Sequence, residues 1–120
     1  MMARNVPFLV LCLGIVPMTS ANAQTTSTGP AIASAISGNT VKGTMDASGS
    51  FEEFFASDGQ IRSSDYSGSW TIEGERLCLA YDGDPASCWE LVIDGANVTW
   101  IGRYGEEGTG TIVPGNPKGF

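Results

Sequence analysis

The sequence contains no histidine, and lysine and arginine together supply only six of its 120 residues. Without histidine the chain lacks the commonest general base and the commonest metal ligand of proteins. Thirteen acidic residues bring the formal net charge to −7, whereas a nucleic-acid partner requires basic side chains against its phosphates. Composition therefore argues against histidine-dependent catalysis and against a nucleic-acid partner.

A long hydrophobic run is also missing. The apolar stretch at residues 6–16 is too short for a membrane-spanning helix, which needs about 20 residues. Arg4 precedes this stretch, and the Ala-Asn-Ala of residues 21–23 matches the small-x-small pattern of a signal-peptidase site. We predict that residues 1–23 are a signal peptide, removed on export to the periplasm; an uncleaved membrane anchor is the alternative.

Cysteine is scarce, and Cys12 lies inside the predicted leader. The two that remain, Cys78 and Cys88, predict one disulfide, because an even number in an exported chain usually pairs. Their spacing is much longer than the Cys-x-x-Cys of a redox pair. With so few thiols and no histidine, we predict neither a metal site nor a cofactor.

The rest of the chain has the pattern of a β protein. Turn signals such as Asp58-Gly59, Gly74-Glu75 and Asp94-Gly95 separate short runs with strand character. Eight strands are predicted, at residues 39–45, 50–57, 60–64, 66–73, 76–81, 87–93, 96–102 and 108–113. No connection is long enough for a crossover helix, so neighbouring strands should pair antiparallel as a meander.

Hairpin registers predict which side chains share a face. Two-residue turns at Gly74-Glu75 and Asp94-Gly95, together with direct pairing of Cys78 with Cys88, place one set of residues on a common apolar side. That set is Trp70, Ile72, Leu77, Leu79, Trp89, Leu91, Ile93, Val98 and Trp100. At the Asp58-Gly59 hairpin we expect Phe54, Ala56 and Ile61 to point inward and Phe51 and Phe55 outward.

A meander with one apolar face must cover that face. We therefore predict an all-β fold: an eight-stranded antiparallel meander that forms a closed or nearly closed small barrel, with the strand at 39–45 paired to the strand at 108–113. A short helical turn in residues 31–37 should precede it. The predicted units are thus a polar tail and helical segment at 24–37 and a single β domain at 38–120. Eight strands enclose a space that side chains fill or that holds one small ligand.

Several short motifs recur in an order that resembles a known group. They are Gly38-Asn39-Thr40-Val41, Asp58-Gly59, Gly68-Ser69-Trp70, the Cys78 and Cys88 pair, Gly108-Thr109-Gly110 and Gly115-Asn116-Pro117. The series resembles small exported alphaproteobacterial proteins of unknown function, which implies a Gram-negative periplasmic setting and no particular activity. In architecture the chain also resembles periplasmic inhibitors of secreted metalloproteases, whose N-terminal segment enters the protease cleft; residues 24–30 would correspond to that segment.

The candidate site is aromatic. Trp70, Trp89 and Trp100 are predicted to line an apolar ligand pocket with Tyr81 at its rim, and the alternative is that they form a packed core. The carboxylates of Asp82 and Asp84, with Ser87, are too few for calcium and indicate a polar hairpin loop.

The acidic doublets Glu52-Glu53 and Glu106-Glu107 are interpreted as solvated surface charge, since adjacent strand residues point to opposite faces. The chain also has no Gly-x-Ser-x-Gly motif. We predict no catalytic residues and a non-enzymatic binding or envelope-associated module, not membrane-spanning after signal cleavage, whose partner is a small apolar ligand or a protein. The alternative is a periplasmic protease inhibitor that acts through its N-terminal segment.

Overall fold

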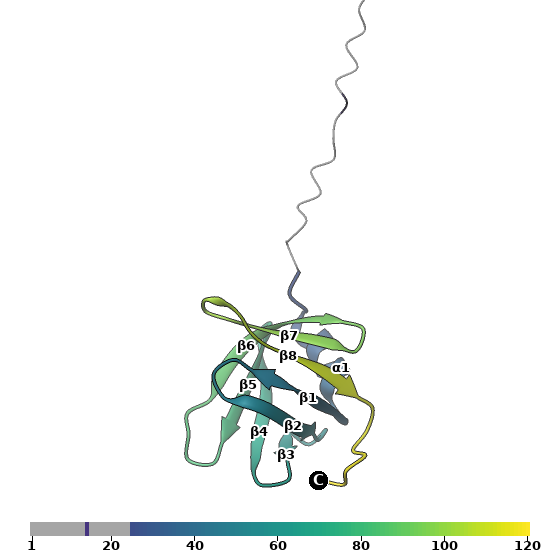
Figure 1. The fold of residues 1–120 in the computed structure, drawn as a ribbon, viewed down its shortest axis with the longest axis vertical. Helices are drawn as coiled ribbons and strands as arrows, with labels where there is room; N and C mark the ends of the chain where they lie inside the picture. The colour runs from purple at the N-terminus through teal and green to yellow at the C-terminus, as the bar shows by residue number, and fades with distance from the viewer. Residues whose placement is uncertain (1–13, 15–24) are drawn as a thin grey trace, which may run out of the picture.

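The computed structural model describes Gly14 and residues 25–120, and these residues form a closed barrel of eight antiparallel strands preceded by one helix (Figure 1). The elements are α1 (Gly29–Ile36), β1 (Asn39–Met45), β2 (Gly49–Phe55), β3 (Gln60–Arg62), β4 (Ser67–Glu73), β5 (Arg76–Tyr81), β6 (Ser87–Asp94), β7 (Asn97–Gly102) and β8 (Gly105–Val113). The predicted fold class is confirmed. Apart from Gly14, the predicted signal peptide lies outside the described residues.

The barrel closes between β1 and β8, which pair antiparallel from Thr40 opposite Val113 to Met45 opposite Gly108. At the middle of this seam Gly43 lies opposite Gly110. A Cβ on Gly43 would stand 2.1 Å from the carbonyl oxygen of Thr109, so only glycine allows the two strands to approach this closely. Each of the eight strands in the described part of the chain therefore has two hydrogen-bonded neighbours, so none of them is an edge strand.

The register predicted for β4, β5 and β6 is confirmed, because Trp70 faces Leu79 and Cys78 faces Cys88. The register predicted between β6 and β7 is wrong by two residues. Asp94 pairs with Asn97, so Gly95 and Ala96 form the turn. A shift of two residues keeps each side chain on its face, and all nine residues predicted to share the apolar side belong to the core or pack against it.

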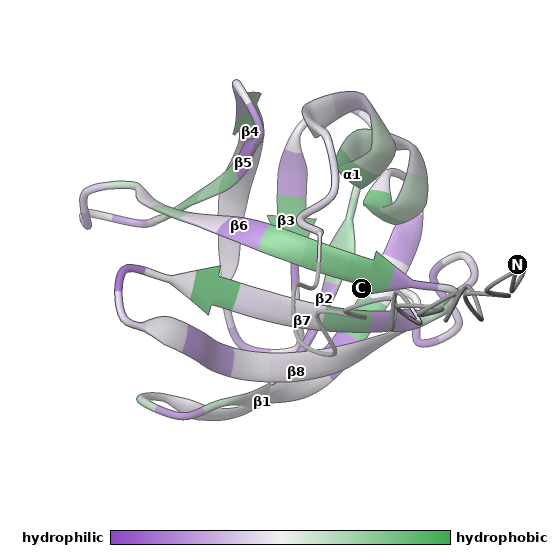
Figure 2. Cartoon of the chain, turned by 90° about the horizontal axis from the view of Figure 1, so that it is seen from above, coloured by the Kyte–Doolittle hydropathy of each residue, from purple (hydrophilic) through white to green (hydrophobic). Residues whose placement is uncertain are grey.

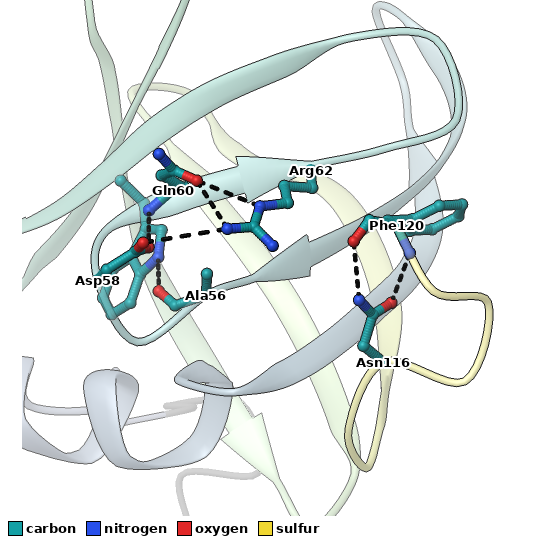
Figure 3. A network of polar contacts seen from close by, with 7 residues as sticks. Ala56, Asp58, Gln60, Arg62, Asn116 and Phe120 are labelled. Carbon is teal, nitrogen blue, oxygen red and sulfur yellow. Dashed lines mark hydrogen bonds and ion pairs between the residues drawn. The ribbon is translucent and has the colours of Figure 1, made fainter.

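The hairpin between β2 and β3 differs from the prediction because its loop has three residues, 57–59, instead of two. Ala56 pairs across the loop with Gln60, its N–H donating to the Gln60 carbonyl at 2.8 Å. Figure 3 shows the Asp58 carboxylate accepting from the Gln60 N–H, while Arg62 reaches back to Gln60 and Asp58. A three-residue loop with glycine in a left-handed conformation at its end, here Gly59, is a common hairpin connection.

The extra loop residue reverses the faces of β2. Phe55 lies opposite Ile61, and both are fully buried. The prediction that Phe54 points inward and Phe51 and Phe55 outward is therefore wrong, since a slip of one residue exchanges the two faces of a strand. The inward-facing residues of β2 are Phe51, Glu53 and Phe55.

Helix α1 covers one end of the barrel, at the right in Figures 1 and 2. Thr28 caps its first turn by accepting a hydrogen bond from the Ala31 N–H, and the Gly29 N–H donates to the carboxylate of Glu75 in the β4–β5 turn. Ile32 and Ile36 are fully buried among the core residues. Helix α1 therefore supplies part of the core of the barrel.

Covalent and terminal contacts tie the strands together further. The predicted disulfide between Cys78 and Cys88 is confirmed and joins β5 to β6. After β8 the chain turns back, and the side chain of Asn116 bonds both the N–H and the carbonyl of Phe120 (Figure 3). In the part of the chain that the structure describes, no helix is both long and apolar enough to cross a bilayer.

Candidate functional site: a cavity at the open end of the barrel

The end of the barrel opposite α1, here called the open end, consists of the loops at residues 46–48, 63–66, 82–86 and 103–104. A cavity of about 730 Å³ opens there, within the size range of pockets that bind small molecules. Its lining comes from six strands and three of these loops: Met45, Ser48, Ser50, Phe51, Glu53, Asp65, Tyr66, Ser67, Leu79, Tyr81, Asp82, Asp84, Trp89 and Trp100. The barrel interior is thus packed at the α1 end and hollow at the open end.

Three aromatic rings form much of the apolar wall. The Trp100 ring meets the rings of Trp89 and Phe51 edge to face, with centroids 5.7 and 5.9 Å apart. Trp89 is held by a 2.8 Å hydrogen bond from its Nε1 to the carboxylate of Glu107. The Nε1 of Trp100 is buried and has no partner among the described residues. These contacts fix the rings without filling the space beside them.

Glu53 is the polar centre of the cavity wall. Only 4% of this residue is exposed, because it lies on the inward face of β2 between Phe51 and Phe55. Its Oε1 accepts two hydrogen bonds, from the hydroxyl of Tyr81 at 2.6 Å and from the hydroxyl of Tyr66 at 2.8 Å. Within residues 25–120 no group donates a hydrogen bond to its Oε2. One carboxylate oxygen is therefore saturated, and the other is left without a protein partner.

Burial governs the protonation of this cluster. Desolvation raises the pKa of Glu53, although the hydroxyls of Tyr81 and Tyr66 counteract it by bonding the charged form. Burial and the neighbouring carboxylate raise the pKa of Tyr66 to about 12 and that of Tyr81 further still. Both tyrosines are thus neutral donors at physiological pH, and Glu53 is the group that titrates first.

The charges around the cavity have one sign. Asp65, Asp82 and Asp84 lie in its lining together with Glu53, and the lining contains no lysine or arginine. The basic residues of the described part of the chain lie elsewhere: Lys42, Arg62, Arg76, Arg103 and Lys118. Like charges around a low-dielectric cavity add their potentials, so the lining of the cavity is a region of negative potential.

The structure brings together three of the four residues predicted for the pocket. Tyr81, Trp89 and Trp100 line the cavity, and Trp70 does not. The ring of Trp70 packs against Phe55, and its Nε1 donates to the carbonyl of Ala56 at 2.9 Å. Trp70 lies too far along β4, toward the α1 end, to reach the cavity. For Trp70 the alternative prediction, a place in the packed core, therefore holds.

The sequence interpretation missed the acidic part of the site. The prediction that both residues of the Glu52-Glu53 doublet are solvated surface charges is wrong for Glu53, which is buried. Glu52 lies on the outer face and pairs with Lys118. Phe51 and Phe55 stand two residues before and after Glu53, which indicates that all three share one face of the strand. The prediction missed this because it gave the β2–β3 loop two residues instead of three, which exchanged the two faces of β2. Glu107 is also only partly exposed, because the β-bulge beside Trp100 leaves it unpaired and available to Trp89.

The loop at residues 82–86 and the cysteine pair each offer few ligands for a metal. In the loop at 82–86 the Asp84 N–H donates to the Tyr81 carbonyl at 2.9 Å, which is the geometry of a tight turn. Across residues 25–120 one cluster of potential metal ligands is found, consisting of Glu73, Cys78 and Cys88. Since both of its sulfurs form the disulfide, this cluster offers one carboxylate.

The fold and the cavity together define a small closed barrel with an acidic, aromatic pocket at one end. Comparisons with known protein families, with curated proteins and with solved structures give no match. The resemblances to exported alphaproteobacterial proteins and to metalloprotease inhibitors stay predictions.

Proposed function

We propose that this protein is a binding barrel of the periplasm that holds one small molecule with an apolar body in the cavity at its open end. The observation that carries the proposal is the cavity of about 730 Å³, walled by aromatic rings around a buried carboxylate. Ligand pockets generally combine an apolar lining with a few convergent polar groups. The cavity matches that description, whereas a fully packed barrel of this size would leave no such space.

A binding role without catalysis agrees with the residues that line the cavity. The lining contains no lysine, arginine or cysteine, and the chain has no histidine. The one deeply buried acid, Glu53, is already occupied on one oxygen by two tyrosine hydroxyls. A nucleophile with an adjacent base, which covalent catalysis requires, does not occur in this lining.

The periplasmic location is supported by two features. The leader at residues 1–23 has the layout of a cleaved signal peptide. The disulfide between Cys78 and Cys88 is a bond that persists in oxidising compartments.

The inhibitor alternative concerns residues 24–30. Ser27 is bound to β6 twice, through its N–H to the Leu91 carbonyl at 2.7 Å and through its Oγ, which accepts from the Ile93 N–H at 3.1 Å. A segment anchored in this way would have to detach before it could enter a protease cleft. Ligand binding needs no such rearrangement, and we therefore place it first.

Binding can be tested with N-phenyl-1-naphthylamine, a neutral apolar dye that fluoresces more strongly in dry pockets. We expect the fluorescence of the dye to rise on binding and its affinity to depend on Trp89 and Trp100, because both line the cavity. A Trp70→Phe variant should retain the affinity, whereas Trp89→Phe should reduce it. Absence of dye binding at saturating concentration, or a signal that depends on Trp70 alone, would overturn the proposal.

A further inference from the structure

We propose that the ligand of this cavity is an organic cation with N–H donors, an alkyl or aryl ammonium whose head group binds Oε2 of Glu53 while its apolar body lies against Phe51, Trp89 and Trp100. The inference rests on the proposed function and adds to it the chemical class of the ligand. Three independent features of the cavity point to such a head group: a missing counter-charge, a free acceptor oxygen and a rim of one sign.

The missing counter-charge is that of Glu53. Buried carboxylates in proteins are normally paired with a positive group, because an isolated charge is costly in a low-dielectric site. Glu53 is 4% exposed, and within residues 25–120 its side-chain partners are the two neutral hydroxyls of Tyr66 and Tyr81. No basic residue lines the cavity. A cationic ligand would supply the charge that the protein omits.

The free oxygen defines the hydrogen bonding that the ligand must offer. Oε1 of Glu53 already accepts two O–H donors, and Oε2 accepts none from residues 25–120. A carboxylate oxygen accepts and cannot donate when ionised, so a fitting head group must carry hydrogens. An ammonium has up to three N–H donors, and its bond to a carboxylate is charge-assisted. A quaternary ammonium has none and satisfies only the charge.

The rim and the walls fit the same class of ligand. Asp65, Asp82 and Asp84 extend the negative potential from Glu53 to the mouth of the cavity, which attracts cations and repels anions. The aromatic rings below suit an apolar body and also attract positive charge through their faces. A neutral apolar ligand would use the rings and leave Oε2 of Glu53 without a partner.

A series of compounds with one aromatic body and different head groups tests the proposal on the wild-type protein by calorimetry. The probes are 2-phenylethylammonium, the neutral 2-phenylethanol, benzyltrimethylammonium and the anionic 3-phenylpropionate. We expect 2-phenylethylammonium to bind about 10-fold or more tightly than 2-phenylethanol, as one charge-assisted hydrogen bond requires. The quaternary cation should bind less tightly than the primary one, and the anion most weakly. Equal affinities across the series, or preference for the anion, would overturn the inference.

Two adjacent glutamates provide a matched pair of variants. Glu53→Gln and Glu52→Gln each remove one negative charge from β2, but Glu52 lies on the outer face and pairs with Lys118. Glu53→Gln should lower the affinity for 2-phenylethylammonium about 10-fold and leave that for 2-phenylethanol unchanged. Glu52→Gln should change neither affinity. If both variants weaken ammonium binding equally, net charge alone attracts the cation and the assignment to Glu53 is wrong.

The outcomes separate the inference from the proposed function. If the protein binds N-phenyl-1-naphthylamine but shows no preference for the ammonium, the inference is wrong and the proposed binding function stands. If it binds none of these probes, both the inference and the proposed function are wrong. Retained dye binding also verifies that Glu53→Gln is folded; should that variant not fold, the wild-type series still decides.

Discussion

At the scale of single residues, the cavity is defined by how Glu53 is held. Its carboxylate lies inside the barrel because β2 alternates Phe51, Glu53 and Phe55 on the inward face. The hydroxyls of Tyr66 and Tyr81 offset part of the cost of burying it, and they come from segments 13 and 28 residues away. Such a buried, partly satisfied group ties the stability of the protein to pH.

The sign of that pH dependence follows from the raised pKa of Glu53. Between the ordinary value of 4.5 and the raised value, the folded state holds a proton that the unfolded state has lost. Stability from this residue is therefore present below pH 4.5 and decreases as pH rises through the folded pKa. Glu53→Gln abolishes this dependence and still offers an acceptor oxygen to both tyrosines.

Thermal melts of the wild type and of Glu53→Gln at pH 4 and pH 7 test this prediction. We expect the variant to gain stability relative to the wild type between the lower and the higher pH. Glu52→Gln is the control and should show no such gain, since its side chain lies outside the barrel. An equal difference between wild type and Glu53→Gln at both pH values would contradict the prediction.

At the scale of elements, the eight strands do not close the barrel at both ends. Helix α1 closes one end with two side chains, Ile32 and Ile36, and the loops of the other end leave the cavity open. A chain this short has a thin core, so an eight-residue helix contributes a substantial share of it. The disulfide holds β5 to β6 and should add roughly 2–3 kcal/mol through the chain entropy of its loop.

Shortening a buried side chain of α1 measures how much the helix contributes to the stability of the barrel. Ile32→Ala should lower the free energy of unfolding by about 2–5 kcal/mol, because it leaves a cavity beneath a fully buried site. Ser34→Ala, at an exposed position of the same helix, should change it by no more than about 0.5 kcal/mol. Chemical denaturation of both variants provides the measurement. Similar values for the two would mean that α1 rests on the barrel without stabilising it.

At the scale of the whole molecule, closure depends on one narrow seam. β1 and β8 meet where Gly43 faces Gly110, and the two glycines differ in the space around them. A Cβ on Gly43 would clash with backbone at 2.1 Å, whereas one on Gly110 would find its nearest neighbour, a Val41 methyl, at 3.1 Å. There is therefore no room for a side chain at Gly43, whereas a methyl group just fits at Gly110.

This asymmetry predicts unequal effects of the same substitution. Gly43→Ala should destabilise the barrel by about 1–3 kcal/mol more than Gly110→Ala, because only the first forces the paired strands apart. Urea denaturation gives the two free energies, and hydrogen exchange of the β1 and β8 amides reports whether the seam itself opens. Equal destabilisation by the two alanines would show that the close approach at Gly43 does not limit closure.

Local patterns in the sequence were sufficient to predict the strands, their antiparallel order, the disulfide and the closure of the barrel. Turn residues and period-two alternation are properties of neighbouring residues, and the pairing of Cys78 with Cys88 follows from one hairpin. Even the two-residue error at Gly95 and Ala96 left the faces correct, because side chains in a strand repeat every two residues. The pocket aromatics Tyr81, Trp89 and Trp100 were predicted for the same reason.

Only the tertiary structure decided where the barrel is hollow and what lines the hollow. The burial of Glu53 depends on one extra residue in the loop at 57–59, and its contacts with Tyr66 and Tyr81 join segments that meet only when the sheet curls. Ile32 and Ile36 become core residues because the barrel has an end for them to cover. Loop lengths, curvature and end closure depend on the whole chain at once, and for that reason no local pattern contains them.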